Sequence, residues 1–233
     1  METGNRQQLP GRIRLVETTS HHVRDTIINH HYSHTTPAAP LNAFWIMGGR
    51  VPLGAITLGV GSGATRKSVP RRLFGQSVSY RQWRTVERLV LFPRWNGGTV
   101  ISQMFSLLFR LAALMGWRFL HTVADERAGN GAGYRASNFT PVRSWVSDAF
   151  GDLSDTPWAE LGVIHKVSYQ ASIPRFEAGM KPESPRMRLV YRLWRKTKER
   201  SFSRMLNKAG GRLLEVRQYE YVRVIDPALM LRL

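Results

Sequence analysis

The middle of this chain reads as a strand, a helix and a second strand, and this order limits the possible fold more than any other part of the sequence. Residues 86–92 and 118–124 are short apolar runs of the kind that form buried strands. Between them, residues 99–115 form a nearly all-apolar stretch of helical length that ends at Gly116. A strand–helix–strand connection forms a right-handed crossover between parallel strands. We therefore expect a parallel pair of strands within an α/β sheet.

Further elements are expected on both sides of this centre. Two strand-like runs are joined by Gly48-Gly49, which is typical of a hairpin, so the sheet is expected to be mixed. The other expected elements are a strand over residues 12–17, a helix over 21–32 with Ser20 as its N-cap, hairpin strands over 42–47 and 51–60, a basic loop over 61–75, and late strands over 160–169 and 216–225. We interpret residues 1–11 as a flexible leader, residues 12–233 as one domain, and residues 174–211 as a basic insertion with helical character over 188–206.

Positive charge is the strongest signal in the composition. The 233 residues hold 34 Lys and Arg against 16 Asp and Glu, a formal net charge of +18. Eight basic residues and one acid lie between residues 64 and 94, and eleven basic residues and two acids lie between 181 and 212. An excess that is both global and local favours a polyanionic partner, most often nucleic acid, over ordinary solvated faces.

The composition of the sequence also argues against several classes of protein. It has no cysteine, which removes disulfides, thiolate metal sites and cysteine nucleophiles. The longest apolar stretch, residues 99–115, includes Ser102 and Arg110 and so predicts a buried helix instead of a membrane span. The N-terminus lacks the apolar region of a signal peptide, so we expect a cytoplasmic protein without a membrane partner.

The segment from Ala124 to Phe139 offers a ligand site. Asp125 lies at the end of an apolar strand, a glycine-rich turn follows, and a short helical piece carries Tyr134 and Asn138. Ligands bind at such strand ends in α/β proteins because backbone N–H groups are free there. Two simpler interpretations stay open, since Asp125 can cap the next helix and Tyr134 can belong to the core.

A second candidate is the histidine-rich end of the first helix. His30 and His34 have the spacing of a metal-binding pair, although Pro37 breaks the helix close by. His31 and Tyr32 offer acid–base chemistry near neutral pH. A histidine here can also simply complement the negative end of the helix dipole.

A third candidate follows in the first central strand. Glu87 and Arg88 form a charged pair inside a run that is otherwise fit for a core, so they need a partner or a ligand. Gly97 and Gly98 then lead into the apolar helix, where free N–H groups can bind a phosphate or a carbonyl. A plain strand–helix turn is the alternative, and Ser102 on that helix is by itself more typical of packing than of a nucleophile.

Taken in order, these segments resemble the GNAT acyltransferase fold, in which two central parallel strands splay apart. Within it they look like the Mom family of phage DNA-modification proteins. The resemblance covers roughly residues 12–170 and a late strand over 219–224. It rests on His31-Tyr32-Ser33, Glu87-Arg88-Leu89, Asn96, Ala124-Asp125 and the run Gly133-Tyr134-Arg135-Ala136-Ser137-Asn138-Phe139.

This resemblance implies an enzyme that adds an acetamido (carbamoylmethyl) group to the exocyclic amine of adenine in double-stranded DNA and so blocks host restriction. The alternatives are a GNAT-type N-acyltransferase for another amine and a non-enzymatic DNA-binding protein. The implied catalytic residues are His31, Tyr32, Asp125 and Tyr134. The implied donor-binding residues are Arg94, Asn96, Gly97, Gly98, Thr99, Ser102 and Asn138. The residues expected to bind DNA are Arg66, Lys67, Arg71, Arg72, Arg84 and Arg88.

The donor itself is not named by the sequence. The usual phosphate-loop signature of acetyltransferases, Gln/Arg-x-x-Gly-x-Gly/Ala, is absent, and the run from Arg94 to Thr99 stands in its place. We therefore expect an acyl or aminoacyl donor, with acetyl-CoA as one candidate. A metal such as iron beside the histidines is a further expectation.

Overall fold

The structure is a computed structural model, and it describes residues 9–31, 37, 40–61, 63–96, 98–128, 131–182 and 184–232. The chain divides into two compact units. The first unit comprises Met1–Ala124, Ala128–Arg143 and Tyr219–Leu233, and the second comprises Asp125–Arg127 and Ser144–Gln218. Two long strands, β6 and β8, contribute residues to both units.

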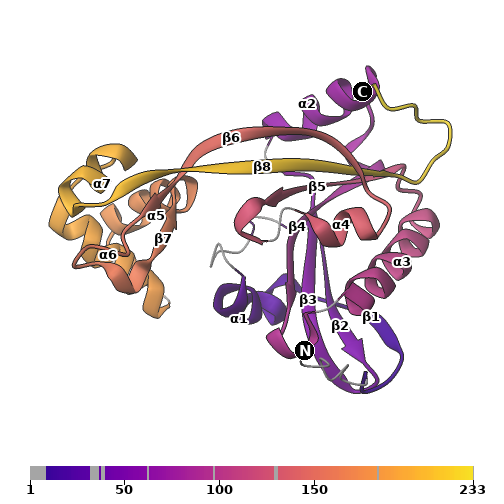
Figure 1. Cartoon of the computed structure of the whole chain (residues 1–233), viewed down its shortest axis with the longest axis horizontal. Coiled ribbons are helices and arrows are strands. Elements are labelled where there is room, and N and C mark those ends of the chain that lie inside the picture. Colours follow the sequence, from indigo (N-terminus) through magenta and orange to yellow (C-terminus); the bar gives the residue numbers. More distant parts are fainter. Residues whose placement is uncertain are drawn as a thin grey trace, which may run out of the picture. The chain divides into compact units, whose positions relative to one another are not determined.

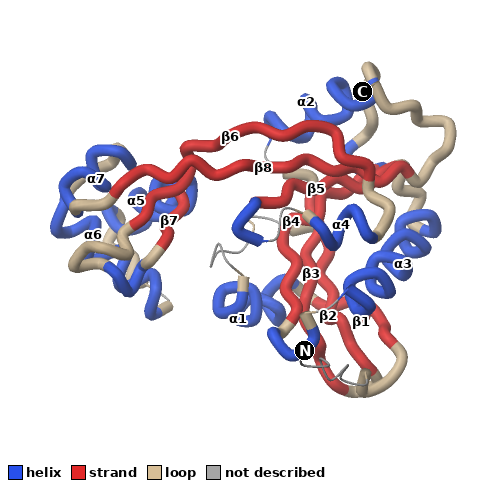
Figure 2. The backbone as a smooth tube through the Cα atoms, in the orientation of Figure 1, coloured by secondary structure: helices blue, strands red, loops and turns tan. Residues whose placement is uncertain are grey.

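The strands form one eight-stranded sheet in the order β1-β2-β3-β4-β5-β8-β6-β7 (Figures 1 and 2). Strands β1, β2, β3 and β4 pair in this order, each antiparallel to the next. Strand β4 then pairs with β5 in parallel. The mixed α/β sheet expected from the sequence is thus confirmed. The strands are β1 (Ile13–Thr18), β2 (Asn42–Gly48), β3 (Val51–Gly59), β4 (Trp83–Leu91), β5 (Phe119–Asp125), β6 (Thr140–Asp152), β7 (Val163–His165) and β8 (Arg212–Val224).

Seven α-helices and four short 3-10 turns are seen in the described part of the chain. The helices are α1 (Ser20–His30), α2 (Gly63–Phe74), α3 (Gly98–Leu114), α4 (Ala132–Ala136), α5 (Lys166–Glu177), α6 (Pro185–Thr197) and α7 (Phe202–Ala209). The 3-10 turns are Tyr80–Gln82, Pro93–Trp95, Glu126–Ala128 and Ala159–Leu161.

In the first unit, helices cover both faces of the sheet (Figure 1). On one face, α3 buries Met104 and Leu108 against the strands. On the other face, α1 buries Val23 and Ile27 against β2, β3 and β4. Because β-strand side chains alternate between the faces, neighbouring positions of β3 serve the two cores in turn.

The central strands β4 and β5 pair only over part of their length. Their parallel register runs from Trp83 opposite Phe119 to Val86 opposite Thr122. Beyond these residues β4 continues to Leu91 and β5 continues to Asp125, and the described residues of the two strands do not pair with each other there. The two strands therefore diverge toward their C-terminal ends, as the sequence comparison with the GNAT fold predicts.

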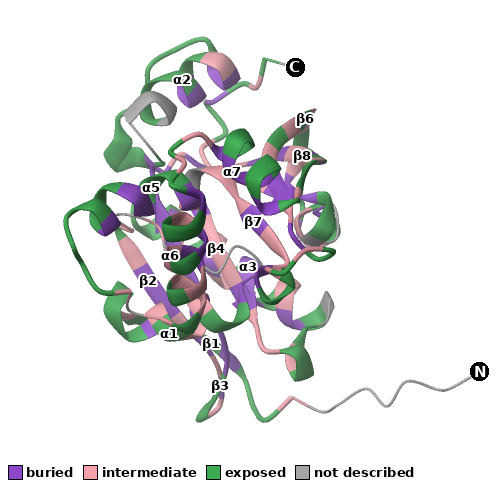
Figure 3. Cartoon of the chain, turned by 90° about the vertical axis from the view of Figure 1, so that its left-hand side faces the viewer, coloured by how far each residue is buried: buried purple, intermediate pink, exposed green. Residues whose placement is uncertain are grey.

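The second unit has its own core. Its helices α5, α6 and α7 bury Tyr169, Leu193 and Phe202 together with Leu153, the residue that follows β6. The solvent side of α6 is mostly coloured as exposed in Figure 3. This separate core anchors each helix through one face and leaves the other face to solvent.

Several expected elements differ from those observed. Residues 61–75, expected as a loop, contain helix α2, because burial of Val69 and Leu73 outweighs the helix-breaking tendency of Pro70. Within residues 160–169, only Val163–His165 is a strand and α5 begins at Lys166. Strand β6, Thr140–Asp152, was not expected, since its polar residues hide the alternation.

Two boundaries are also corrected. The first helix is flanked by Thr19, not Ser20, and no side chain caps it. Strand β4 begins at Trp83, three residues earlier than expected. Among the described residues, no helix is long and apolar enough to cross a bilayer. The expected leader, single domain and insertion stay predictions, and residues 1–8 lie outside the described part.

Candidate active site

A bulge in β4 places Glu87 at the point where β4 and β5 begin to diverge. Against β3, Thr57 lies opposite Arg88 but Leu58 lies opposite Val86, so Glu87 has no opposite residue. A bulge breaks the alternation of a strand and redirects the side chain that it carries. Such bulges are common next to active sites.

The Glu87 carboxylate is only partly satisfied. The backbone N–H of Gly61 donates to its Oε1 at 3.4 Å. Its Oε2 is buried and accepts no hydrogen bond from the described residues. Burial raises the pKa of Glu87 above its ordinary value, against the opposing effects of the Gly61 N–H and of the Arg88 charge. This carboxylate is therefore suited to take a proton.

The carboxylate also lies directly against the backbone of β3. A Cβ placed on Gly59 would overlap the carboxylate oxygens of Glu87, so the carboxylate in this position occupies the space that a side chain at residue 59 would take. Because side chains of a strand alternate, the Cβ side of Gly59 is the same face of β3 as the side chain of Thr57. Glu87 and Thr57 thus share one face of the sheet, which is the face covered by α1.

Next to Thr57 there is a cavity of about 220 Å³. Thr57 is 1% exposed, and its Oγ1 has no hydrogen-bond partner in the described part of the chain. A buried hydroxyl without a partner is unfavourable, and it is typical of a site that a ligand or water completes. The cavity is lined by Ser20, His21, Arg24, Ile27, Pro37, Pro40 and Thr57.

The predicted histidine site lies on the same helix. His31 follows the last residue of α1, is 7% exposed, and its backbone N–H donates to the Ile27 carbonyl at 2.9 Å. Tyr32 and His34 lie outside the described residues, so their predicted roles stay predictions. Within the described ranges, no group of three or more His, Asp or Glu side chains is arranged to hold a metal ion.

Asp125, the last residue of β5, belongs to the second unit and is held by its neighbours. Its side chain is 0% exposed, and Arg127 binds it in a bidentate manner, with Nε 2.9 Å from Oδ1 and Nη2 2.6 Å from Oδ2. Gln218 adds a donor 3.4 Å from Oδ2. The Arg127 guanidinium also lies 3.8 Å above the ring of Phe150. A carboxylate held this firmly is suited to orienting other groups.

Tyr134 and Asn138 lie in and after the short helix α4 of the first unit. The Tyr134 ring lies 5.4 Å from Phe105, 5.3 Å from Phe139 and 5.8 Å from Tyr221. Tyr134 thus forms part of an aromatic cluster at the edge of the core. Asn138 has a left-handed backbone with φ of 61°, and its carbonyl accepts from Arg223 at 3.1 Å.

Apart from Asn138, the predicted donor-binding residues belong to one stretch of sequence, which runs from the end of β4 into the start of α3. Arg94 lies in a 3-10 turn, with its guanidinium 4.9 Å above the Trp95 ring. Asn96 is exposed and follows that turn, while Gly97 lies outside the described residues. Gly98, Thr99 and Ser102 form the start of α3, where unpaired N–H groups favour an anion.

The six arginines and lysines predicted to bind DNA divide into two groups. Arg66, Lys67 and Arg71 are exposed along α2. The other three bind groups of the protein: Arg72 pairs with Glu220, Arg84 donates to Asn42 Oδ1 at 2.9 Å, and Arg88 donates to the Glu87 carbonyl at 2.6 Å.

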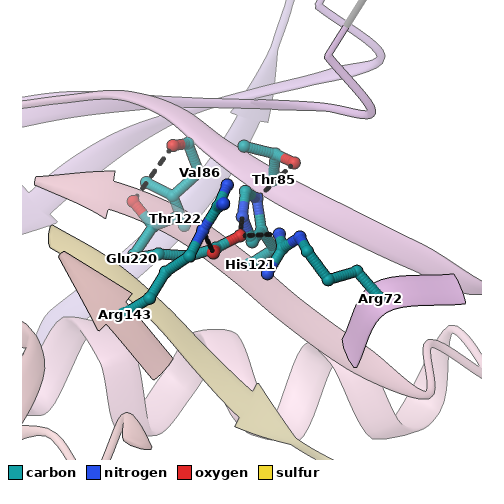
Figure 4. A network of polar contacts seen from close by, with 7 residues as sticks. All are labelled: Arg72, Thr85, Val86, His121, Thr122, Arg143 and Glu220. Atoms are coloured by element: carbon teal, nitrogen blue, oxygen red, sulfur yellow. Dashed lines mark hydrogen bonds and ion pairs between the residues drawn. The ribbon is translucent and has the colours of Figure 1, made fainter. Parts of the chain in front are cut away.

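A buried polar network surrounds Glu220 of β8 on the face that α2 covers (Figure 4). The side chain of Glu220 is 2% exposed and contacts three groups: Arg72, the Nε2 of His121 at 2.7 Å and the Nε of Arg143 at 2.7 Å. Thr85 Oγ1 lies 3.2 Å from Nδ1 of that histidine. Burial opposes ionisation, but the hydrogen bonds from His121 and Arg72 lower the pKa of Glu220 to about 2.

A mixed sheet with diverging central parallel strands defines a GNAT-like α/β protein. A probable GNAT-family acetyltransferase from Chromobacterium violaceum ATCC 12472 is 8% identical, with a TM-score of 0.44 over 94% of this chain and 90% of that one. An N-acetyltransferase from Staphylococcus aureus Mu50 is 11% identical, with a TM-score of 0.44 over 92% and 99%. A Bacillus subtilis acetyltransferase solved with CoA is 11% identical, with a TM-score of 0.38 over 57% and 78%. These low values describe a likeness in outline.

The sequence places the chain more narrowly. The chain belongs to the Mom protein family, whose pattern matches residues 12–233. This confirms the resemblance that the ordered motifs indicate. No curated protein sequence matches the chain.

Two features of the site go beyond the predicted residues. The sequence indicates that the charge of Glu87 needs a partner. Only the tertiary structure shows that Glu87 lies at a bulge and that its Oε2 has no hydrogen-bond partner. Thr57 carries no signal at all, since a threonine in a strand is ordinary. The shared face of Glu87 and Thr57 arises from β3–β4 pairing, which no local pattern reveals.

Proposed function

We propose that this protein modifies DNA in the host cytoplasm by transferring an acetamido group to the exocyclic amine of adenine, which protects the DNA from restriction. Family membership supports the reaction. The net charge of +18 supports the polyanionic substrate. The observation that carries the chemistry is the half-satisfied carboxylate of Glu87, on the same face of the sheet as the Thr57 cavity.

The amine of adenine is a poor nucleophile, because its lone pair is delocalised into the ring. As the nitrogen forms a bond to the methylene carbon of the carbamoylmethyl group, it must lose a proton, and the donor's leaving group departs from that carbon with its electron pair. We assign the proton to Glu87, whose raised pKa favours uptake. His31 at the end of α1 is the second candidate for this role.

The cavity beside α1 provides a place for the base. An adenine in a duplex must be extruded or approached through the major groove before its amine can be reached. A buried site for a base must offer hydrogen bonds to its polar edge. The unpartnered Oγ1 of Thr57 can supply one of them.

The remaining predicted residues complete the proposal. The start of α3, with Thr99 and Ser102, holds an anionic part of the donor together with Arg94, Asn96 and Asn138. Exposed Arg66, Lys67 and Arg71 of α2 hold the DNA backbone. Asp125 orients its neighbours and Tyr32 donates to developing charge, while Tyr134 packs in the aromatic cluster beside α3.

The test is to express the protein, digest the host DNA to nucleosides and measure their masses. We expect a deoxyadenosine heavier by one acetamido group, and we expect it to disappear in the His31→Ala, Asp125→Ala and Glu87→Gln variants while DNA binding persists. An unmodified nucleoside profile from the active protein would refute the proposal. Weak DNA affinity with little salt dependence would instead favour an N-acyltransferase for another amine.

A further inference from the structure

Helix α6 of the second unit carries a continuous basic stripe. Arg188, Arg192, Arg195 and Lys196 are all exposed, and their spacing of three and four residues puts them on one side of the helix. Val190, Leu193 and Thr197 on the other side are buried. The core of the unit therefore fixes the direction in which the stripe faces.

Two described acids close to α6 in the sequence, Glu177 and Glu199, pair with basic residues outside this stripe. Glu177 is bound by Arg200, whose Nη2 lies 2.8 Å from Oε2. Glu199 is bound by Lys208 at 2.7 Å. Within the part of the chain that the structure describes, Arg188, Arg192 and Lys196 form no ion pair.

The ends of α6 hold the stripe in a defined geometry. Ser184 caps the first turn by accepting from the Met187 N–H at 3.2 Å, and Pro185 begins the helix. From Arg188 to Lys196 the stripe rises about 12 Å along the helix axis. This length equals the rise of about three to four phosphates of one strand of B-form DNA.

The chemistry of α6 favours DNA over a membrane surface as its partner. A helix that binds a membrane surface inserts its apolar face between the lipids. The apolar face of α6 is already buried against Tyr169 and Phe202 in the core of the second unit. Only charge remains for a partner, and regularly spaced charge fits a phosphate backbone.

We propose that the stripe of Arg188, Arg192, Arg195 and Lys196 binds the phosphate backbone of double-stranded DNA, in addition to the basic residues of α2 in the first unit. The choice of DNA as the polyanion rests on the proposed function. The stripe contacts phosphates without regard to sequence, so it raises affinity and adds no base specificity.

The test compares two full-length variants with the same change in charge. One is R188Q/R192Q/K196Q, and the control is R12Q/R50Q/R110Q, which removes three exposed arginines scattered over the first unit. Binding of each to a labelled duplex of random sequence is measured between about 50 and about 200 mM salt. Thermal unfolding confirms that both variants fold, as expected for exposed side chains.

For the stripe variant we expect the slope of log affinity against log salt to shrink by about 3, since each phosphate contact contributes about 0.9. The control should keep a slope close to that of the parent protein. Equal slopes in the two variants would overturn the inference, as would a stripe variant that loses binding to anionic lipid vesicles but keeps its DNA binding.

The inference and the proposed function can fail separately. If the parent protein leaves adenine unmodified but the stripe variant shows the reduced salt slope, the inference about the stripe is supported and the proposed reaction is refuted. If adenine is modified while the stripe variant binds DNA like the control, the reaction stands and the stripe falls.

Discussion

Glu87 and Glu220 both place a carboxylate in the interior of the first unit, but their surroundings are opposite. Three basic groups bind Glu220, and its pKa falls to about 2. Glu87 accepts one long hydrogen bond, and burial raises its pKa. A satisfied buried charge holds structure together, whereas an unsatisfied one is retained at a cost in stability. The comparison therefore points to Glu87 for chemistry and to Glu220 for architecture.

The largest effect is expected on the reaction when Glu87 is neutralised. Glu87→Gln should lower the rate of adenine modification by about 10²- to 10⁴-fold, because it removes the proton acceptor. The initial rate of formation of the modified nucleoside, followed by mass, measures this loss. The stability at neutral pH should stay the same or rise, since the buried charge is gone.

The matched control for that experiment is Glu17→Gln, which neutralises an exposed glutamate of β1 in the same unit. It should leave the rate unchanged. If Glu87→Gln retains the full rate while His31→Ala abolishes it, the histidine is the proton acceptor. The assignment of Glu87 to catalysis would then be wrong.

Glu220 should show the reverse pattern. Glu220→Gln should lower the free energy of unfolding by about 3 kcal/mol, because Arg72, His121 and Arg143 lose their shared anion. Denaturant unfolding measures this change, with exposed Glu215→Gln of the same strand as the control. A loss no larger than that of the control would mean that the network adds nothing to stability.

The parent protein and the Glu220→Gln variant should also differ in how their stability depends on pH in acid. The pKa of Glu220 drops from 4.5 to about 2 on folding, so its stabilisation is fully present above pH 4.5 and is lost as the pH falls toward 2. Free energies of unfolding measured across this range should fall more steeply for the parent protein than for Glu220→Gln. Parallel curves would contradict the assignment.

The smallest effect is expected at Thr57. Thr57→Val keeps the shape but removes the hydroxyl, so the KM for DNA should rise by about tenfold while stability is kept or improved, because an unpaired buried group is lost. Thr57→Ser should retain most of the binding, and it controls for the loss of the methyl group. Equal KM values for the Val and Ser variants would remove Thr57 from the proposed base site.

Local patterns of the sequence predict the centre of the fold well. The apolar helix over residues 99–115 is observed as Gly98–Leu114, and the strand over 51–60 is observed as Val51–Gly59. These elements can be predicted from the pattern of apolar residues within a short stretch of sequence. Helix α2 was missed because its polar, proline-containing sequence becomes helical only through burial against distant strands.

The candidate site, too, could be predicted from the sequence only in part. The sequence indicated Glu87-Arg88, the turn before the apolar helix and Asp125, because charge and glycine stand out in apolar surroundings. It could not reveal which charges are satisfied. Arg72 and Glu220 are separated by 148 residues, and no local pattern joins them.

The sequence by itself determined the parallel α/β centre, the strong positive charge and membership of the Mom family, since these depend on local order and composition. Only the tertiary structure decided that Glu220 is bound by three basic partners while Glu87 keeps a buried oxygen without a hydrogen-bond partner. The reason is physical: the energy of a buried charge depends on the groups within a few ångströms of it, and chain folding alone brings those groups together.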